Sequence, residues 1–160
     1  MASVTIPWSI CSIGSLLWPH EEEQEIANAV LAAARQELEA VQFCPERRKC
    51  RGVDVPRDEV LYGRFPYKFA GSSLAPRPLE SLPPNLSILV SRVFDRHKEL
   101  QASFSPRVLI NRYANPKDRV GWHSDKNTHP DTPVYSLSFG SGMTLAVREK
   151  SEACNCCRKH

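Results

Sequence analysis

The stretch Val108-Leu109-Ile110-Asn111-Arg112-Tyr113 and, shortly after it, Gly121-Trp122-His123-Ser124-Asp125 decide the fold and site predictions. The apolar, β-branched first run is typical of a strand, and 119–123 is expected to be the next strand. Alternate residues of a strand point to the same face, so we expect His123 and Asp125 on one face. One imidazole and one carboxylate are two of the three ligands in the facial triad that holds non-haem Fe(II). His123 and Asp125 are therefore candidate iron ligands.

The pattern around this pair predicts helices first and short strands afterwards. Apolar residues at helical spacing predict helices over 20–42 and 85–100. Short strand-like runs are expected at 59–62, 67–69, 134–139 and 143–148, and the Ser/Pro/Leu-rich segment 72–84 is expected to be an extended loop. Helices followed by a run of strands predict an α+β fold built around a β-sandwich.

The bulk composition narrows the class of protein. A chain of 160 residues with a formal charge of +3 is long enough for one packed domain, and its mild positive charge suits an anionic partner. It carries six cysteines, but the apolar segment 6–18 is not preceded by Lys or Arg as in a signal peptide, and no apolar run is long enough to span a membrane. We therefore expect an intracellular protein with reduced thiols and no membrane partner.

Two further clusters leave alternatives open. The run Arg47-Arg48-Lys49-Cys50-Arg51 is predicted with equal weight as a nucleic-acid contact or import signal and as a solvated loop. The tail carries four soft metal ligands, Cys154, Cys156, Cys157 and His160. Their spacing lacks the paired Cys-x-x-Cys of structural zinc sites, so a disordered, oxidation-prone tail is favoured over a zinc site.

Taken together, the motifs resemble the AlkB family of Fe(II)/2-oxoglutarate-dependent nucleic-acid dealkylating dioxygenases, and most of all its eukaryotic DNA-repair members. The resemblance covers roughly residues 53–148. It is carried by Val55-Pro56-Arg57, Leu61-Tyr62-Gly63, Tyr67-Lys68-Phe69-Ala70-Gly71, Leu109-Ile110-Asn111-Arg112-Tyr113, His123-Ser124-Asp125 and Ser136-Leu137-Ser138-Phe139-Gly140.

The resemblance implies a fold and a role for each matching residue. The implied core is a double-stranded β-helix, or jelly roll, with N-terminal helices and a nucleotide-recognition lid. His123 and Asp125 would bind Fe(II), and Asn111 and Tyr113 would contact 2-oxoglutarate beside Leu109. The substrate-binding residues would be Arg57, Tyr67, Phe69 and Asn127, the last at a position that is acidic in the family. Aromatic lid residues would stack on a flipped base, since chemistry on a base requires its extrusion from the duplex.

The implied activity is oxidative dealkylation of alkylated DNA or RNA, by a monomer in the nucleus, the cytoplasm or both. The family's distal iron-binding histidine and its C-terminal 2-oxoglutarate-binding arginine have no counterpart in the sequence. We therefore expect an incomplete jelly roll in a C-terminally truncated chain, with an N-terminal extension at 1–52, a partial dioxygenase domain at 53–148 and a Cys-rich tail at 149–160. The alternatives are a non-catalytic nucleic-acid-binding relative, sensitive to substitution of Arg47, Arg48 or Arg57, and a Cys/His zinc-binding interaction module.

Overall fold

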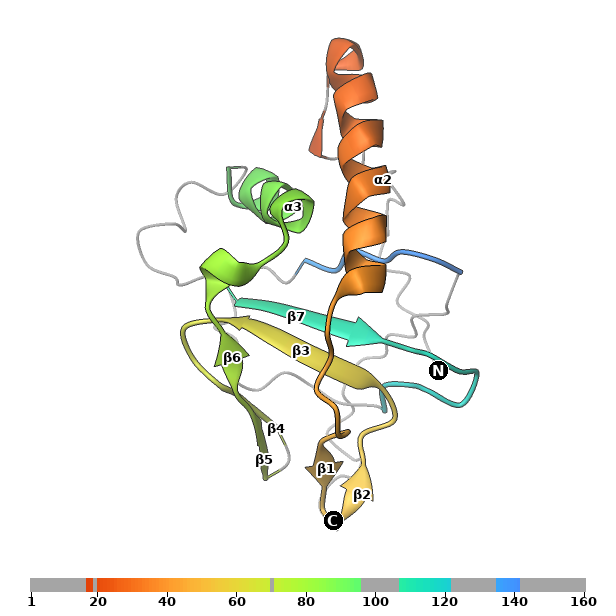
Figure 1. The fold of residues 1–160 in the computed structure, drawn as a ribbon, viewed down its shortest axis with the longest axis vertical. Helices are drawn as coiled ribbons and strands as arrows, with labels where there is room; N and C mark the ends of the chain where they lie inside the picture. Colours follow the sequence, from red (N-terminus) through yellow and green to blue (C-terminus); the bar gives the residue numbers. More distant parts are fainter. Residues whose placement is uncertain (1–16, 19, 70, 96–106, 122–134, 142–160) are drawn as a thin grey trace, which may run out of the picture.

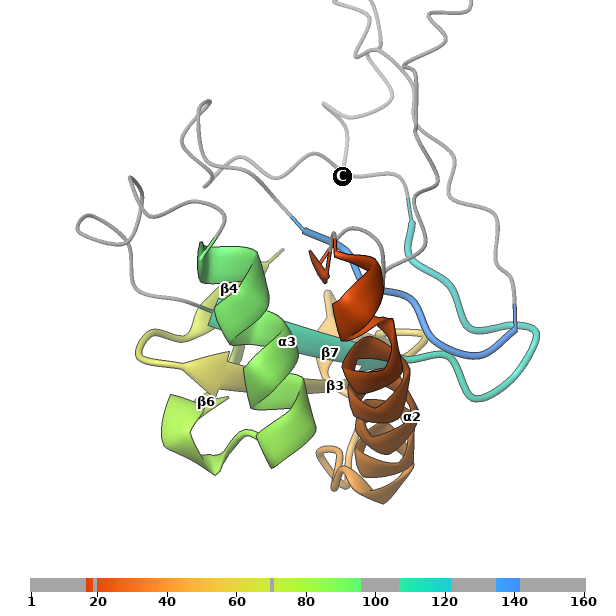
Figure 2. The same ribbon diagram turned by 90° about the horizontal axis from the view of Figure 1, so that it is seen from above.

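A three-stranded sheet covered on one face by two helices forms the centre of the computed structural model (Figures 1 and 2). The structure describes residues 17–18, 20–69, 71–95, 107–121 and 135–141. The sheet has the order β6-β3-β7, with β3 (Asp58–Gly63) antiparallel to β7 (Arg107–Arg112) and parallel to β6 (Pro76–Arg77). The α+β class predicted from the sequence is confirmed at this level.

Both predicted helices are present, and they pack side by side over the sheet (Figure 2). The first is a short 3-10 turn, η1 (Glu21–Glu23), followed by α2 (Gln24–Ala40), which buries small apolar residues of one stripe. It ends two residues earlier than predicted, because Val41 already has extended dihedral angles of φ −59° and ψ 126°. The second helix, α3 (Pro84–Asp95), begins one residue earlier than predicted with a proline, which fits the first turn of a helix.

Two short hairpins lie below the sheet in the view of Figure 1, whereas α2 extends above it. In the first, β1 (Lys49–Cys50) pairs with β2 (Val53–Asp54) through Arg51 and Gly52, whose φ angles are 53° and 82°. Two consecutive left-handed residues are typical of the tight hairpin turns whose twist matches that of the strands. In the second, β4 (Tyr67–Phe69) pairs with β5 (Ser72–Leu74). The first hairpin spans residue 52, where the sequence predicted a domain boundary.

The predicted extended loop at 72–84 is wrong in part. It contains β5, β6 and a 3-10 turn, η2 (Leu79–Ser81). The strand β6 exists only because Pro76 and Arg77 lie beside Leu61 and Tyr62 of β3, a contact that the local Ser/Pro-rich pattern does not reveal. A proline is compatible with this position because β6 is at the edge of its sheet.

The strands predicted at 119–123 and 134–139 are not found in the described parts of those segments. Residues 119–121 and 135–139 have no regular secondary structure, because no ladder of hydrogen bonds joins them to a neighbouring strand within the part of the chain that the structure describes. The apolar alternation in 134–139 still indicated which side chains are turned to the core, since Leu137 and Phe139 pack against it. The remainder of both segments and the strand predicted at 143–148 lie outside the described residues.

The hydrophobic core lies between the helices and the sheet. Val60 and Tyr62 of β3 face the helices, and Val108 and Ile110 of β7 pack against the same cluster. On the opposite face of β3, Leu61 is fully buried. Among the described residues, no helix is both long and apolar enough to cross a membrane.

Candidate functional site

Strand β7 presents the residues predicted to bind 2-oxoglutarate on the sheet face away from the helices. Val108 and Ile110 of β7 pack against the core on the helix side of the sheet. Because side chains alternate along a strand, Leu109 and Asn111 point to the other face. Leu109 is half-buried and lies opposite Leu61, whereas Asn111 is exposed and lies opposite Glu59. Tyr113 is half-buried and directly follows the strand. The structure thus brings Leu109 and Asn111 to one face, with Tyr113 next to its end.

Arg57 holds the side chain of Asn111. Its Nε donates a hydrogen bond to Oδ1 of Asn111 at 3.1 Å, and its Nη2 donates to Oε1 of Glu59 at 2.8 Å. The Arg57 and Glu59 side chains are 8% and 3% exposed. Arg57, predicted from the resemblance to bind nucleic acid, is therefore engaged inside the protein through these two nitrogens. Its role toward nucleic acid stays a prediction.

Arg48 completes a buried ionic cluster with Glu59 and Arg57. Its Nε and Nη2 donate to the two carboxylate oxygens of Glu59 at 2.9 and 3.2 Å, and its side chain is only 7% exposed. The guanidinium also lies over the ring of Tyr67, 5.6 Å from the ring centroid, while its Nη1 has no hydrogen-bond partner among the described residues. Two guanidinium groups around one carboxylate leave a net positive charge behind Asn111.

A second ionic cluster fixes the turn that follows β7. Arg47 donates from Nη1 and Nη2 to Asp118 and from Nε to Asp58, and Arg112 donates from Nε to the other oxygen of Asp58. The hydrogen bonds from Arg47 hold the pKa of Asp118 below its usual value, and those two aspartates raise the pKa of Arg47. Burial raises the pKa of Asp58, but hydrogen bonds from Arg112 and Arg47 outweigh it and the pKa is lowered.

This second cluster also sets where the chain continues towards the predicted iron ligands. Asp118 accepts a hydrogen bond from the backbone N–H of Ala114, and the N–H of Arg119 donates to the carbonyl of Pro56 at 2.8 Å. Residues 119–121 therefore start next to the segment that carries Arg57. His123, Asp125 and Asn127 lie outside the described residues, as does the side chain of Phe69. Within the described ranges, no group of three His, Cys, Asp or Glu residues is placed to hold a metal ion.

The basic run 47–51 divides into internal and exposed members. Arg48 is buried and Arg47 is held by two aspartates, whereas Lys49 and Arg51 are exposed on the first hairpin. The two alternatives predicted for this run were a nucleic-acid contact or import signal and a solvated loop. Neither describes Arg47 and Arg48, which bind carboxylates of the same domain. The acidic partners Asp58, Glu59 and Asp118 were not identified from the sequence. Asp58 and Glu59 lie at the start of a buried strand, and this position could have predicted basic partners for them, because buried charges require partners.

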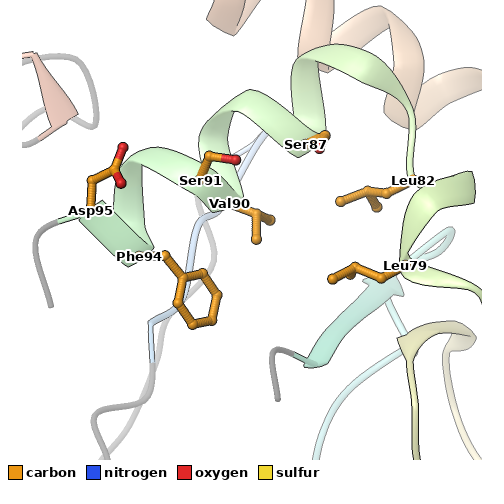
Figure 3. Close-up of a pocket in the computed structure, with 7 residues that line it drawn as sticks. All are labelled: Leu79, Leu82, Ser87, Val90, Ser91, Phe94 and Asp95. Carbon is orange, nitrogen blue, oxygen red and sulfur yellow. The ribbon is translucent and has the colours of Figure 1, made fainter. Parts of the chain in front are cut away.

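Two cavities lie in the part of the chain that the structure describes, and Asn111 lines neither of them. One, of about 350 Å³, lies between the segment before β1 and strand β5, and is lined by Cys44, Glu46, Arg47, Arg48, Lys49, Glu59, Ser73 and Leu74. The other, of about 270 Å³, lies between α3 and η2 and is lined mostly by apolar side chains, with Ser87, Ser91 and Asp95 at its polar side (Figure 3). None of the residues predicted to bind 2-oxoglutarate lines either cavity.

Comparisons with known proteins agree with the residue pattern. The chain matches the 2OG-Fe(II) oxygenase superfamily over residues 13–160. It is 33% identical over 100 residues to the mouse DNA oxidative demethylase ALKBH2, a match that covers 60% of this chain and 39% of that protein. It is also 33% identical over 102 residues to the human alpha-ketoglutarate-dependent dioxygenase alkB homolog 3, covering 59% of this chain and 32% of that protein. No solved structure matches the chain.

Proposed function

Because this chain belongs to the 2OG-Fe(II) oxygenase superfamily and is an AlkB-type member of it, we propose that it is a dioxygenase that oxidatively removes alkyl groups from nucleic-acid bases. The superfamily implies Fe(II) and 2-oxoglutarate as cofactors. The matched stretch covers 39% and 32% of the length of these two relatives, so the activity of the whole protein is part of the proposal. The structural observation that carries it is the presentation of Asn111 on β7, with Oδ1 engaged by Arg57 and the residue exposed.

The chemistry of Asn111, Tyr113 and Leu109 supports 2-oxoglutarate as the ligand. The Asn111 amide nitrogen and the Tyr113 hydroxyl are hydrogen-bond donors, as a carboxylate acceptor requires. The net positive charge of the Arg48–Glu59–Arg57 cluster behind Asn111 favours a dianionic ligand. Half-buried Leu109 would contribute an apolar wall next to the chain of the ligand. Bound Fe(II), with 2-oxoglutarate and O2 as co-substrates, would supply the oxidation that hydroxylates an N-alkyl group, which then leaves as an aldehyde.

The proposal extends to further residues and to features of the whole protein. His123 and Asp125 are proposed iron ligands, and Tyr67, Phe69 and Asn127 are proposed substrate-binding residues. The proposed architecture is a jelly roll with a nucleotide-recognition lid, within the division 1–52, 53–148 and 149–160. The similarity to a DNA oxidative demethylase of the mouse supports an alkylated nucleic acid as the substrate class. We propose a monomer that acts in the nucleus, the cytoplasm or both.

The test is substrate-stimulated turnover of 2-oxoglutarate. The purified full chain is given Fe(II), 2-oxoglutarate and an N-methylated single-stranded oligonucleotide, and succinate release is measured. We expect release that the methylated oligonucleotide stimulates, and that His123→Ala and Asp125→Ala abolish. His20→Ala is the matched control, since His20 is exposed beside the first helix. Folded protein that binds the oligonucleotide without succinate release would contradict the proposal and support the non-catalytic alternative.

A further inference from the structure

The orientation of the Asn111 amide is determined by its neighbours on the sheet. An asparagine side chain has one oxygen, which accepts hydrogen bonds, and one nitrogen, which donates them, and its orientation is set by its hydrogen-bond partners. An arginine has donors only. Since Arg57 Nε lies 3.1 Å from the amide of Asn111, the oxygen must face Arg57 and the nitrogen must face away from it.

Arg57 is itself held in place, so it can hold Asn111. Its Nη2 is bound by Oε1 of Glu59, and Glu59 is held from the other side by the two-pronged contact of Arg48. Glu59 and Asn111 are direct partners across the antiparallel strands β3 and β7. The cluster is buried, whereas Asn111 is exposed on the sheet face away from the helices. The hydrogen bonds from Arg48 and Arg57 to Glu59 restrain the Arg57 guanidinium, and its Nε in turn restrains the Asn111 amide.

We propose that Arg57 is a positioning residue for 2-oxoglutarate, which acts by fixing the Asn111 amide with its nitrogen towards a carboxylate of that ligand. The proposal rests on the proposed function, because it takes Asn111 as a ligand-binding residue. Without the Arg57 guanidinium the Asn111 amide can rotate by half a turn. Its oxygen would then face the carboxylate oxygen of the ligand, and two hydrogen-bond acceptors repel each other. This assignment differs from the role implied by family resemblance, in which Arg57 faces the nucleic acid.

A double-mutant cycle on 2-oxoglutarate binding tests the proposal. Affinity is measured by anaerobic calorimetry on the full chain with Fe(II), for the wild type, Arg57→Met, Asn111→Ala and the double variant. We expect Arg57→Met to weaken binding by about tenfold, the effect of removing one hydrogen bond. If Arg57 acts through Asn111, the double variant binds no more weakly than Asn111→Ala alone. Effects that multiply in the double variant would overturn the proposal.

The variant Asn111→Asp separates ligand binding from structure. Its carboxylate still accepts the hydrogen bond from Arg57, but it has no amide donor and it repels an anionic ligand. We expect its urea unfolding midpoint to equal or exceed that of the wild type, while its 2-oxoglutarate affinity is abolished. An Asn111→Asp protein with wild-type affinity would overturn the proposal.

Nucleic-acid affinity and NMR provide the remaining discrimination. Arg57→Met should leave the affinity for a methylated oligonucleotide within about twofold of wild type. A large loss of that affinity, with unchanged 2-oxoglutarate affinity, would make Arg57 a substrate contact and overturn the proposal.

The NMR signal of the Arg57 Nε–H group gives a test that requires no bound ligand. In the wild type this proton should exchange slowly with water, and its resonance should shift in Asn111→Ala. An unshifted resonance overturns the positioning role. Wild-type protein that binds no 2-oxoglutarate overturns the proposed function as well, whereas wild-type binding that Arg57→Met leaves unchanged overturns this inference alone.

Discussion

Arg47 joins Asp118 by two hydrogen bonds of 2.8 Å, from Nη1 to Oδ1 and from Nη2 to Oδ2, across 71 residues of sequence. A planar guanidinium facing a carboxylate in this way gives a geometrically defined contact. It ties the segment before the first hairpin to the turn after β7, from which the chain continues towards His123 and Asp125. The contact therefore helps to determine where the proposed site begins.

The Asp118 contact should make stability sensitive to acid. Because the pKa of Asp118 is lowered in the folded protein by Arg47, the stabilisation is present above the unfolded pKa of about 3.9 and is lost as the pH falls through the folded pKa. We expect the urea midpoint to fall on acidification below about pH 4, and to fall less steeply in Asp118→Asn. Asp54→Asn, an exposed aspartate on β2, is the control and should follow the wild type. Equal acid sensitivity in Asp118→Asn would contradict this role.

Glu37 of α2 should stabilise the start of α3. It accepts hydrogen bonds from the Asn85 N–H at 3.0 Å, the Asn85 side-chain amide at 2.8 Å and the Leu86 N–H at 3.0 Å. The unsatisfied N–H groups at the start of a helix are normally capped by a local side chain, and here a neighbouring helix supplies the acceptor. We expect Glu37→Ala to lower the free energy of unfolding by about 1–2 kcal/mol.

The matched control for that prediction is Glu39→Ala on the same helix. The Glu39 side chain is 73% exposed and forms a 3.9 Å ion pair with Arg35, so its removal should cost less than about 0.5 kcal/mol. Burial raises the pKa of Glu37, but the hydrogen bonds from Asn85 and Leu86 outweigh it and lower the pKa. The difference between the two variants should therefore shrink as the pH falls through the folded pKa. Equal destabilisation by both variants at neutral pH would rule out the cap.

Arg48 should be the most sensitive member of the basic run 47–51. Its removal leaves the buried Glu59 carboxylate with Arg57 as its remaining guanidinium partner. Removing one partner of a buried ion pair destabilises a protein by about 3–5 kcal/mol when the other charge is left uncompensated. Because Arg57 still pairs with Glu59, we expect a smaller loss of about 1.5–3 kcal/mol for Arg48→Met in urea denaturation. Lys49→Met, next to it and exposed, should change stability by less than about 0.5 kcal/mol. If both variants were equally stable, the buried cluster would not be a structural element.

The elements that could be predicted from the sequence are those with a local signal. Both helices carry an apolar stripe, and β3, β4 and β7 are apolar or aromatic runs between turn residues, so their positions follow from periodicity. The strand β6 and the partners of Arg47 and Arg48 depend on contacts between distant segments, which leave no local pattern. For the same reason the hydrogen bond from Arg57 to Asn111 could not be predicted from the sequence, and the nucleic-acid role of Arg57 stays a prediction from the resemblance.

The exposed members of the basic run should carry its electrostatic attraction for nucleic acid. Lys49 and Arg51 are exposed on the first hairpin, whereas Arg47 and Arg48 are paired with carboxylates. We expect Lys49→Gln/Arg51→Gln to weaken oligonucleotide binding and to reduce the slope of log affinity against log salt by about one for each phosphate that is no longer neutralised. Arg35→Gln, an exposed arginine on α2, should leave the slope unchanged. A slope unaltered by the double substitution would place the nucleic-acid interface elsewhere.

Mass spectrometry of an N-methylated single-stranded oligonucleotide, incubated with the full chain, Fe(II) and 2-oxoglutarate in air, tests the proposed function most directly. We predict that the methylated base is converted to the unmodified base, that formaldehyde is released, and that neither occurs with His123→Ala or without 2-oxoglutarate. An oligonucleotide that keeps its methyl group in the presence of folded, 2-oxoglutarate-binding protein would contradict the assignment of this chain as a nucleic-acid dealkylase.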